Sequence, residues 1–312
     1  MSQVNNEAKY PGVFKTDDGS AAVVTMETAA SEAAGAYPIT PSTQMGEGWA
    51  TAVARGDKNV NGRNLIFFEP EGEHAAAGVT AGMSMVGLRS TNFSSGQGIA
   101  YMHESLYAAV GKRLTYVLNI GARAMTKATL NVHAGHDDYH CIDDTGFFQL
   151  FAKNAQAAAD LNLIAHRIAE LALTPGAIAQ DGFLTTHLIE SMMVPERALI
   201  AEYLGKPSDI IETPTPAQRI IYGETRRRIP VLWDVDYDAP ANRLIAKAAV
   251  VRHARRHQRM GKLQQQGRAA GQVEHVDGLV PGKPGQHQPG RDPADGPEHA
   301  DQRELLLRVG DV

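Results

Sequence analysis

Short apolar stretches alternate with longer segments rich in small residues between residues 20 and 235 of the 312-residue chain. The Ala-rich segment 20–34 predicts a helix, which Gly35 can end in a left-handed conformation, and residues 36–39 predict a short strand. Further strands are predicted over 65–68, 91–94 and 114–120, and further helices over 44–54, 73–86, 99–110 and 154–173. Strands that alternate with helices of this length indicate a doubly wound α/β fold, with a mainly parallel sheet covered on both faces.

Polar or glycine-containing segments follow four of the predicted strands. They are Thr40 and the segments 69–73, 95–98 and 121–123. Sheets of this class bind ligands in the crevice beyond the carboxyl ends of their strands. We therefore expect functional residues in these four segments.

The composition changes abruptly beyond Pro240. No aromatic residue follows Tyr237, and Arg, Gln, His, Gly and Pro dominate. Such a segment buries too little apolar surface to offset a chain entropy of roughly 1–2 kcal/mol per residue. We predict an N-terminal arm over 1–19, a folded domain over 20–240 and a disordered, low-complexity tail over 241–312. A reading-frame shift near residues 239–243 would explain the change, and a disordered linker is the alternative.

Composition and charge narrow the class of protein. The chain has 43% apolar residues and a formal net charge of -5, which suit a globular core and do not indicate a nucleic-acid partner. No run approaches 18 apolar residues and residues 1–19 lack the apolar centre of a secretory signal, so we expect a cytoplasmic protein without a membrane span. Cys141 is the only cysteine, which excludes an internal disulfide and a self-contained iron-sulfur cluster.

Two polar clusters can be interpreted in more than one way. Residues 133–141 contain three His, two Asp and one Cys, from which zinc could take ligands. His-rich loops also arise from polar packing, and we predict no metal site here. The cationic run 226–228 predicts a solvated turn.

Two motifs carry a resemblance to a known family. The first is Tyr37-Pro-Ile-Thr-Pro-Ser-Thr-Gln-Met-Gly-Glu47, and the second is Glu-Gly-Glu-His-Ala-Ala-Ala-Gly, which runs from Glu71 to Gly78. Together they resemble the first domain of the pyruvate:ferredoxin (flavodoxin) oxidoreductases and their 2-oxoacid relatives. The resemblance extends as far as Asp236 and implies the thiamine-diphosphate-binding fold, in its pyrimidine-binding form.

The resemblance implies that Glu73 binds the aminopyrimidine of thiamine diphosphate. A carboxylate hydrogen-bonded to N1′ of the pyrimidine favours the imino tautomer that acts as the base, while the cofactor performs the carbanion chemistry. On physical grounds alone Glu69 and Glu71 compete with Glu73, because the positive end of a helix dipole favours any acid by about 0.3–1 kcal/mol. The match to the family motif favours Glu73.

Other residues at the same strand ends are implied to meet the substrate and the cofactor. Thr40 is implied to hydrogen-bond the 2-oxoacid, and Arg123 to face its carboxylate, for which the planar guanidinium fork is suited. Three further residues are implied to contact the cofactor: Pro38, Ile39 and Gln97. The structural alternative for Arg123 is a surface ion pair. For Thr40 it is a turn that caps the following helix, although Ser42 or Thr43 is the better cap there.

The sequence departs from the family at several positions. Gly96 replaces a serine, and Leu184 replaces an arginine that bears on the choice of oxoacid. No Gly-Asp-Gly segment for the Mg-diphosphate is present. The resemblance therefore implies only the pyrimidine half of the cofactor site, with Mg and the [4Fe-4S] clusters in a separate domain or subunit of the parent enzyme.

The leading hypothesis is the pyrimidine-binding domain of a 2-oxoacid:ferredoxin/flavodoxin oxidoreductase, inactive alone. The parent enzyme would oxidatively decarboxylate pyruvate or a related 2-oxoacid to its acyl-CoA. Its expected partners are the 2-oxoacid, coenzyme A, ferredoxin or flavodoxin, the diphosphate-binding half and further copies of the chain in a homo-oligomer. The alternatives are an alpha subunit of a multi-subunit oxidoreductase and a non-catalytic, pseudogene-type fragment.

Overall fold

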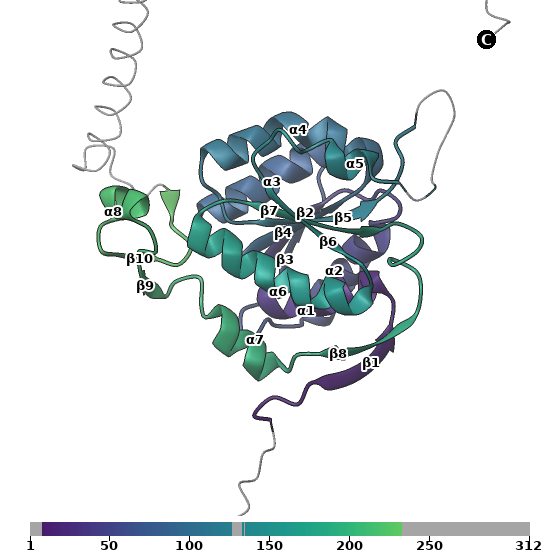
Figure 1. Ribbon diagram of the computed structural model, residues 1–312, viewed down its shortest axis with the longest axis horizontal. Coiled ribbons are helices and arrows are strands. Elements are labelled where there is room, and N and C mark those ends of the chain that lie inside the picture. The colour runs from purple at the N-terminus through teal and green to yellow at the C-terminus, as the bar shows by residue number, and fades with distance from the viewer. Residues whose placement is uncertain (1–7, 127–132, 134, 233–312) are drawn as a thin grey trace, which may run out of the picture. The chain divides into compact units, whose positions relative to one another are not determined.

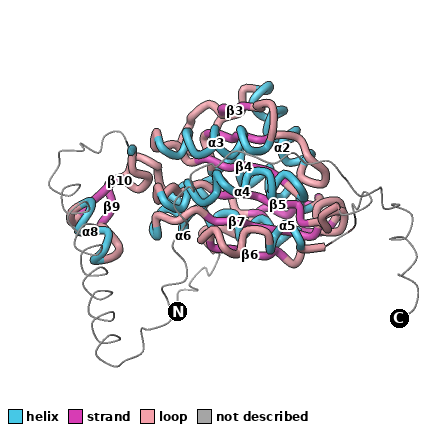
Figure 2. Tube along the Cα trace, turned by 90° about the horizontal axis from the view of Figure 1, so that it is seen from above, coloured by secondary structure: helices cyan, strands magenta, loops and turns pink. Residues whose placement is uncertain are grey.

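A parallel sheet of six strands forms the centre of the fold (Figure 1). The computed structural model describes residues 8–126, 133 and 135–232. The six strands are β2 (Ala33–Ala36), β3 (Ile66–Phe68), β4 (Ser90–Ser94), β5 (Val117–Ala122), β6 (Phe148–Ala152) and β7 (Gly176–Asp181). They lie in the order β3-β2-β4-β5-β7-β6, and Figure 2 shows β3 at one edge and β6 at the other. The predicted parallel sheet is confirmed.

Helices cover both faces of this sheet. On one face lie α1 (Gly19–Ala30), α2 (Thr43–Arg55) and α6 (Ala155–Ala172), and on the other lie α3 (Glu73–Met85), α4 (Gly96–Gly111) and the short α5 (Asp137–His140) (Figure 1). Alternate residues of β5 face the two layers. Leu118 and Ile120 pack in the core with Ile99 of α4, whereas Val117 packs with Ala165 of α6. The predicted doubly wound arrangement is confirmed.

The connections diverge between the neighbouring strands β2 and β4. The chain continues from β2 into α2 on one face and from β4 into α4 on the opposite face. Where connections diverge in this way, a crevice opens beyond the carboxyl ends of the strands. The segments that follow β2, β3, β4 and β5 meet at the carboxyl ends of the strands. We name this end of the sheet the carboxyl edge.

Shorter elements flank the sheet. β1 (Val13–Asp17) pairs antiparallel with β8 (Glu190–Val194), so part of the predicted N-terminal arm is a strand. β9 (Ile210–Glu212) pairs with β10 (Thr225–Arg227), and α7 (Arg197–Leu204) and α8 (Pro216–Tyr222) are the remaining described helices. The tail predicted over 241–312 lies outside the described residues. No described helix is long and apolar enough to cross a membrane.

The helix predicted over 20–34 is wrong at its end. It stops at Ala30, and the small residues that follow form β2 between β3 and β4. Gly35 is a strand residue instead of a helix cap, and a β-carbon there would lie 2.7 Å from Thr80 Oγ1 of α3. Close packing against α3 thus overrides the helix propensity of these residues. The strand predicted over 36–39 is accordingly wrong as well.

Two other predictions need correction. The strand predicted over 114–120 starts too early, because β5 begins at Val117. The solvated turn predicted over 226–228 is wrong, because Arg226 is 5% exposed and donates to the backbone oxygens of Glu170 and Leu171. These carbonyls belong to the last turn of α6, where they lack partners within the helix. Arg226 therefore caps the C-terminal end of α6.

Two buried charged clusters join helices to the sheet. Arg89 Nε donates to Glu170 Oε1 at 2.6 Å, and both side chains are fully buried. Glu27 of α1 accepts a hydrogen bond from Asn119 Nδ2 of β5 at 2.8 Å and lies 2.9 Å from His166 Nε2 of α6. Burial alone would raise the pKa of Glu27, but His166 and the hydrogen bonds to the carboxylate hold it below its usual value.

Candidate functional site

Glu73 begins α3, just after the loop that follows β3. Its half-buried side chain crosses Gly98 of α4, where a β-carbon would lie 2.7 Å from Glu73 Cγ and 2.9 Å from Glu73 Oε1. The same position would lie 2.7 Å from Ser94 Oγ, a buried hydroxyl that has no hydrogen-bond partner among the residues the structure describes. The carboxylate forms no hydrogen bond or ion pair within the described part of the chain. It is therefore available to a ligand.

The two competing acids have different surroundings. Glu69 and Glu71 are both exposed, and Glu71 lies in the bend before α3. Glu69 lines a separate cavity. Of the three acids, Glu73 is the one that lies against the buried polar groups at the start of α4.

Arg123 follows β5 and is only 7% exposed. Its Nη2 donates to Gln97 Oε1 at 3.1 Å, while Arg123 Nε and Gln97 Nε2 have no hydrogen-bond partner among the described residues. Burial lowers the pKa of Arg123, and the nearby Asp138 opposes this shift. The surface ion pair considered from the sequence is wrong, because the guanidinium is buried and bonded to a neutral amide.

Gly96 makes room for this buried guanidinium. Its φ is +52°, and a β-carbon there would lie 2.3 Å from Arg123 Nε. The serine that the family resemblance implies at this position would collide with Arg123 and would hold a left-handed backbone that favours glycine. The position of Arg123 therefore explains why glycine, and not the serine of the family, stands at position 96.

Asp138 of α5 holds the segments after β4 and β5 together. Its Oδ2 accepts hydrogen bonds from Gly96 N at 2.7 Å and from Arg123 N at 3.0 Å. Burial raises the pKa of Asp138, and these backbone hydrogen bonds oppose the shift. No role for Asp138 was predicted from the sequence, and its place in the His-rich segment 133–141 was the available signal.

The turn after β2 packs against the end of β5. The Thr40–Pro41 bond is cis, Pro41 is buried and Thr40 is exposed. A β-carbon at Gly121 would lie 2.9 Å from Pro41 Cγ, so the ring fills the space beside that glycine. Ser42 stands at the start of α2 as predicted, but its hydroxyl donates back to Ile39 O at 2.8 Å and does not cap the helix.

Four buried polar atoms near these residues lack hydrogen-bond partners in the described part of the chain: Ser94 Oγ, Ser95 Oγ, Gln97 Nε2 and Arg123 Nε. Buried polar groups are normally satisfied, so this concentration indicates a ligand site. We name Glu73, Ser94, Ser95, Gln97 and Arg123 the Glu73 cluster. It offers a carboxylate, two hydroxyls, an amide and a guanidinium. These groups fit the ring nitrogens and amino group of an aminopyrimidine, and the carboxylate of an oxoacid.

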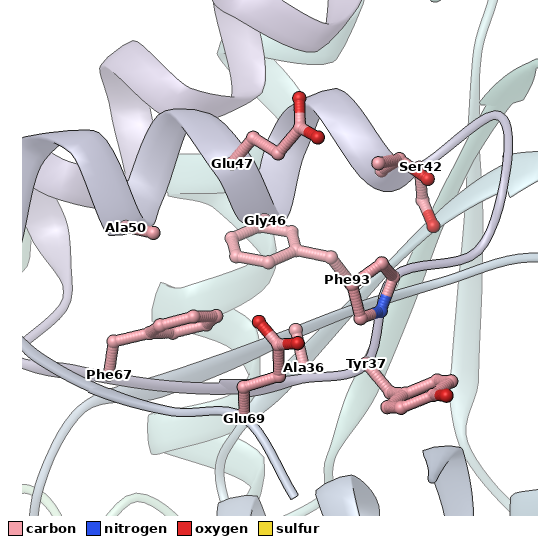
Figure 3. Close-up of a pocket in the computed structure, with 11 residues that line it drawn as sticks. Ala36, Tyr37, Ser42, Gly46, Glu47, Ala50, Phe67, Glu69 and Phe93 are labelled. Atoms are coloured by element: carbon pink, nitrogen blue, oxygen red, sulfur yellow. The ribbon is translucent and has the colours of Figure 1, made fainter. Parts of the chain in front are cut away.

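A cavity lies against the turn after β2 (Figure 3). Its main lining side chains are aromatic, apolar or acidic: Tyr37, Pro38, Glu47, Phe67, Glu69 and Phe93. Of the predicted cofactor contacts it includes Pro38, but neither Glu73 nor Gln97. The predicted site residues therefore gather at one edge of the sheet without sharing a single cavity.

The acids and imidazoles of the His-rich segment pair with neighbouring groups. His136 Nε2 lies 2.9 Å from Asp181 Oδ1, and His140 Nδ1 lies 3.1 Å from Asp143 Oδ2. Burial raises the pKa of the Cys141 thiol. Among the residues that the structure describes, no group of three or more His, Cys, Asp or Glu could hold a metal ion.

Known proteins of one family are similar to this chain in sequence. The sequence model of the family described as "Pyruvate flavodoxin/ferredoxin oxidoreductase, thiamine diP-bdg" matches residues 25–243. The pyruvate-flavodoxin oxidoreductase of Klebsiella pneumoniae is 34% identical over 197 residues, which are 63% of this chain and 17% of that protein. Pyruvate synthase subunit PorA of Pyrococcus abyssi is 37% identical over 173 residues, which are 55% of this chain and 42% of that subunit. The chain thus spans less than half the length of either relative.

A solved structure shows the same fold. It is the 2-oxoglutarate:ferredoxin oxidoreductase from Magnetococcus marinus with 2-oxoglutarate, coenzyme A and succinyl-CoA bound. The TM-score is 0.52, and the match covers 60% of this chain and 32% of that chain at 22% sequence identity. At this identity the likeness concerns the fold.

Proposed function

Because this chain belongs to the pyruvate flavodoxin/ferredoxin oxidoreductase family of thiamine diphosphate-binding domains, we propose that it supplies the pyrimidine-binding half of the cofactor site in a 2-oxoacid oxidoreductase. The complete enzyme oxidatively decarboxylates pyruvate or a related 2-oxoacid to its acyl-CoA and passes the electrons to ferredoxin or flavodoxin. The observation that carries this proposal is the unpaired carboxylate of Glu73 beside the unsatisfied hydroxyl of Ser94.

Glu73 controls the protonation of the pyrimidine ring. When bound, thiamine diphosphate supplies the carbanion chemistry of the decarboxylation. The Glu73 carboxylate would accept a hydrogen bond from N1′ and so would favour the imino form of the exocyclic amino group. The unsatisfied Gln97 Nε2 and Ser94 Oγ provide further polar contacts for the ring and its substituents.

Arg123 supplies the positive charge for the substrate carboxylate. One of its terminal nitrogens is bonded to Gln97, while its Nε is unsatisfied. A guanidinium donates strong, directional hydrogen bonds to a carboxylate, particularly where water is excluded. Thr40 is exposed on the turn at the same edge and offers a hydroxyl to the oxoacid. A buried cation at the same end of the strands as this hydroxyl favours a 2-oxoacid over a neutral substrate.

We assign the diphosphate half of the site and the electron carriers to another domain or subunit. Cys141 is the only cysteine of the chain, whereas an iron-sulfur cluster takes four thiolates. The Pyrococcus relative is named as a subunit, and the Klebsiella relative is a much longer chain. The matching segment therefore occurs among the relatives both in a separate subunit and in a much longer chain. A cytoplasmic location and a homo-oligomer stay predictions.

The pyrimidine half of thiamine, 4-amino-5-hydroxymethyl-2-methylpyrimidine, tests this proposal on the chain itself. In an NMR titration we expect saturable shifts in the backbone amides of Glu73 and residues 95–98, and in the side-chain amide of Gln97. The bound ring should be protonated at N1′ at a higher pH than the free ring, and Glu73→Gln should abolish this difference. Glu71→Gln is the matched control and should retain it. Shifts confined to another surface, or a Glu73→Gln variant that behaves like the wild type, would contradict the proposal.

A further inference from the structure

A polar cavity of about 420 Å³ lies at the amino ends of the strands, opposite the carboxyl edge that holds the Glu73 cluster. Its walls come from segments just before the amino ends of three parallel strands: Glu32 before β2, Asn61 and Arg63 before β3, and 86–88 before β4. The segment 206–208 after α7 and Arg227 of β10 complete the walls. The strands separate this cavity from the carboxyl edge, so it is distinct from the proposed cofactor site.

Positive charge dominates the lining of this cavity. Arg63, Lys206 and Arg227 contribute cations, and Glu32 contributes the one carboxylate of the lining residues. Glu32 Oε1 lies 3.8 Å from Arg63 Nε, and the Glu32 side chain is only 10% exposed. Lys206 Nζ and the Arg227 guanidinium have no hydrogen-bond or ion-pair partner within the described part of the chain. Among the described residues, two cations of the lining therefore remain without an anionic partner.

The cavity also has hydrogen-bond donors to spare. Asn61 Nδ2 and Arg227 Nε are buried and have no acceptor among the described residues. Both atoms can only donate. Since buried donors normally find an acceptor, a molecule that fills this cavity must bring acceptor oxygens. Ser208 and Lys206 add further donors at its mouth, where both residues are exposed.

Gly87 shapes the wall that carries Arg227. Its φ is +83°, and a β-carbon there would lie 2.7 Å from Val231 Cγ2 and 3.6 Å from Arg227 Nη2. The glycine thus lets the turn before β4 approach the segment after β10 closely. This approach brings Arg227 to the same cavity as the segment before β4.

We propose that this cavity binds a phosphate group of a small soluble ligand, either free phosphate or a phosphate monoester. A phosphate dianion matches three cations set against one carboxylate better than a monocarboxylate does. Its several acceptor oxygens can engage Arg227, Asn61 and Lys206 together, and hydrogen bonds between charged groups are the strong ones. The site lies outside the proposed cofactor site, so the ligand would act through binding and not through the chemistry at the carboxyl edge.

Titration calorimetry of the full chain tests the site with inorganic phosphate, adenosine 5′-monophosphate and acetate as probes. The variant Lys206→Gln/Arg227→Gln should lower the affinity for phosphate at least about tenfold, the usual effect of losing a charged hydrogen bond. Lys112→Gln/Arg113→Gln removes the same charge from two exposed side chains outside the cavity and should leave the affinity unchanged. Lys206→Gln alone affects an exposed side chain, so it tests the site even if the double variant is unstable.

The three probes separate the possible sources of the phosphate group. Equal affinities for phosphate and the nucleotide would support free phosphate, and tighter binding of the nucleotide would support a monoester. The absence of saturable binding of both, an equal loss of affinity in the control variant, or acetate binding as tight as that of phosphate would each overturn the proposal.

Discussion

The guanidinium of Arg123 lies against the backbone of Gly96, where a β-carbon would come within 2.3 Å of Arg123 Nε. Gly96→Ala would displace Arg123 and hold an alanine at a φ of +52°. We expect the free energy of unfolding to fall by about 1–3 kcal/mol, the usual cost of such a backbone conformation. We also expect the hydrogen bond between Arg123 and Gln97 to be lost. Urea denaturation measures the first effect, and the Arg123 Nη resonances in NMR spectra report the second.

Gly111→Ala is the matched control for this substitution. Gly111 lies at the other end of α4, and apart from its chain neighbours and the nearby helix backbone no described atom lies within 4 Å of the position of its β-carbon. Alanine is favoured over glycine in helices by about 1 kcal/mol, so this variant should be at least as stable as the wild type. A Gly96→Ala variant with unchanged stability and an unchanged Arg123 resonance would show that the described packing of Arg123 is wrong.

The buried carboxylate of Glu27 predicts a loss of stability in acid. Burial acts to raise its pKa, but His166 and the hydrogen bonds to the carboxylate hold it below the usual value of 4.5. Folding thus favours the ionised form, so this stabilisation is present above about pH 4.5 and is lost as the pH falls through the lower pKa of the folded state. Urea denaturation as a function of pH should show this loss. Glu27→Gln should reduce the dependence on pH, and an unchanged dependence would contradict the assignment.

Arg89 and Glu170 form a fully buried pair, with Nε to Oε1 at 2.6 Å and Nη2 to Oε2 at 3.1 Å. Arg89→Met would leave the carboxylate buried without this partner, which typically costs about 3–5 kcal/mol. The double variant Arg89→Met/Glu170→Met removes both charges and should be more stable than Arg89→Met. Free energies of unfolding from urea denaturation test this order. Equal destabilisation of the two variants would mean that the unpaired charge is not the cause.

The doubly wound fold could be predicted because short apolar stretches alternate with longer helical segments along the chain. The segment 20–36 could not be divided correctly from the sequence. Its small residues have high helix propensity, and those of β2 form a strand because α3 packs closely on Gly35. The pairing of β1 with β8 joins residues from distant parts of the chain, and neither strand was predicted.

The position of the site followed from the sequence more readily than its internal contacts. Glu73 and Arg123 each follow a predicted strand, and parallel strands bring such residues to one edge. The role of Asp138 depends on a hydrogen bond from Gly96 N, 42 positions away in the chain. No local pattern encodes that contact, so neither the role of Asp138 nor the need for glycine at position 96 could be predicted.

The chain alone is expected to bind thiamine diphosphate weakly in the presence of Mg and to show no oxidation of pyruvate. The Glu73 cluster is proposed to bind the pyrimidine and the oxoacid, but not the diphosphate, which carries most of the charge of the cofactor. Titration calorimetry should give a dissociation constant well above the micromolar range, and a viologen-reduction assay should show no turnover. Submicromolar binding or measurable turnover would reveal a second half-site within this chain.

Hydrogen-deuterium exchange at C2 of the thiazolium ring, in a complex of this chain with a diphosphate-binding subunit, tests the role of Glu73 most directly. Glu73→Gln should slow this exchange by about 10²- to 10⁴-fold, the usual contribution of a positioned acid or base, and should weaken cofactor binding far less. Glu69→Gln and Glu71→Gln serve as controls, since both side chains are exposed, and should exchange near the wild-type rate. Normal exchange in Glu73→Gln together with slow exchange in either control would contradict the assignment and identify the other acid as the partner of N1′.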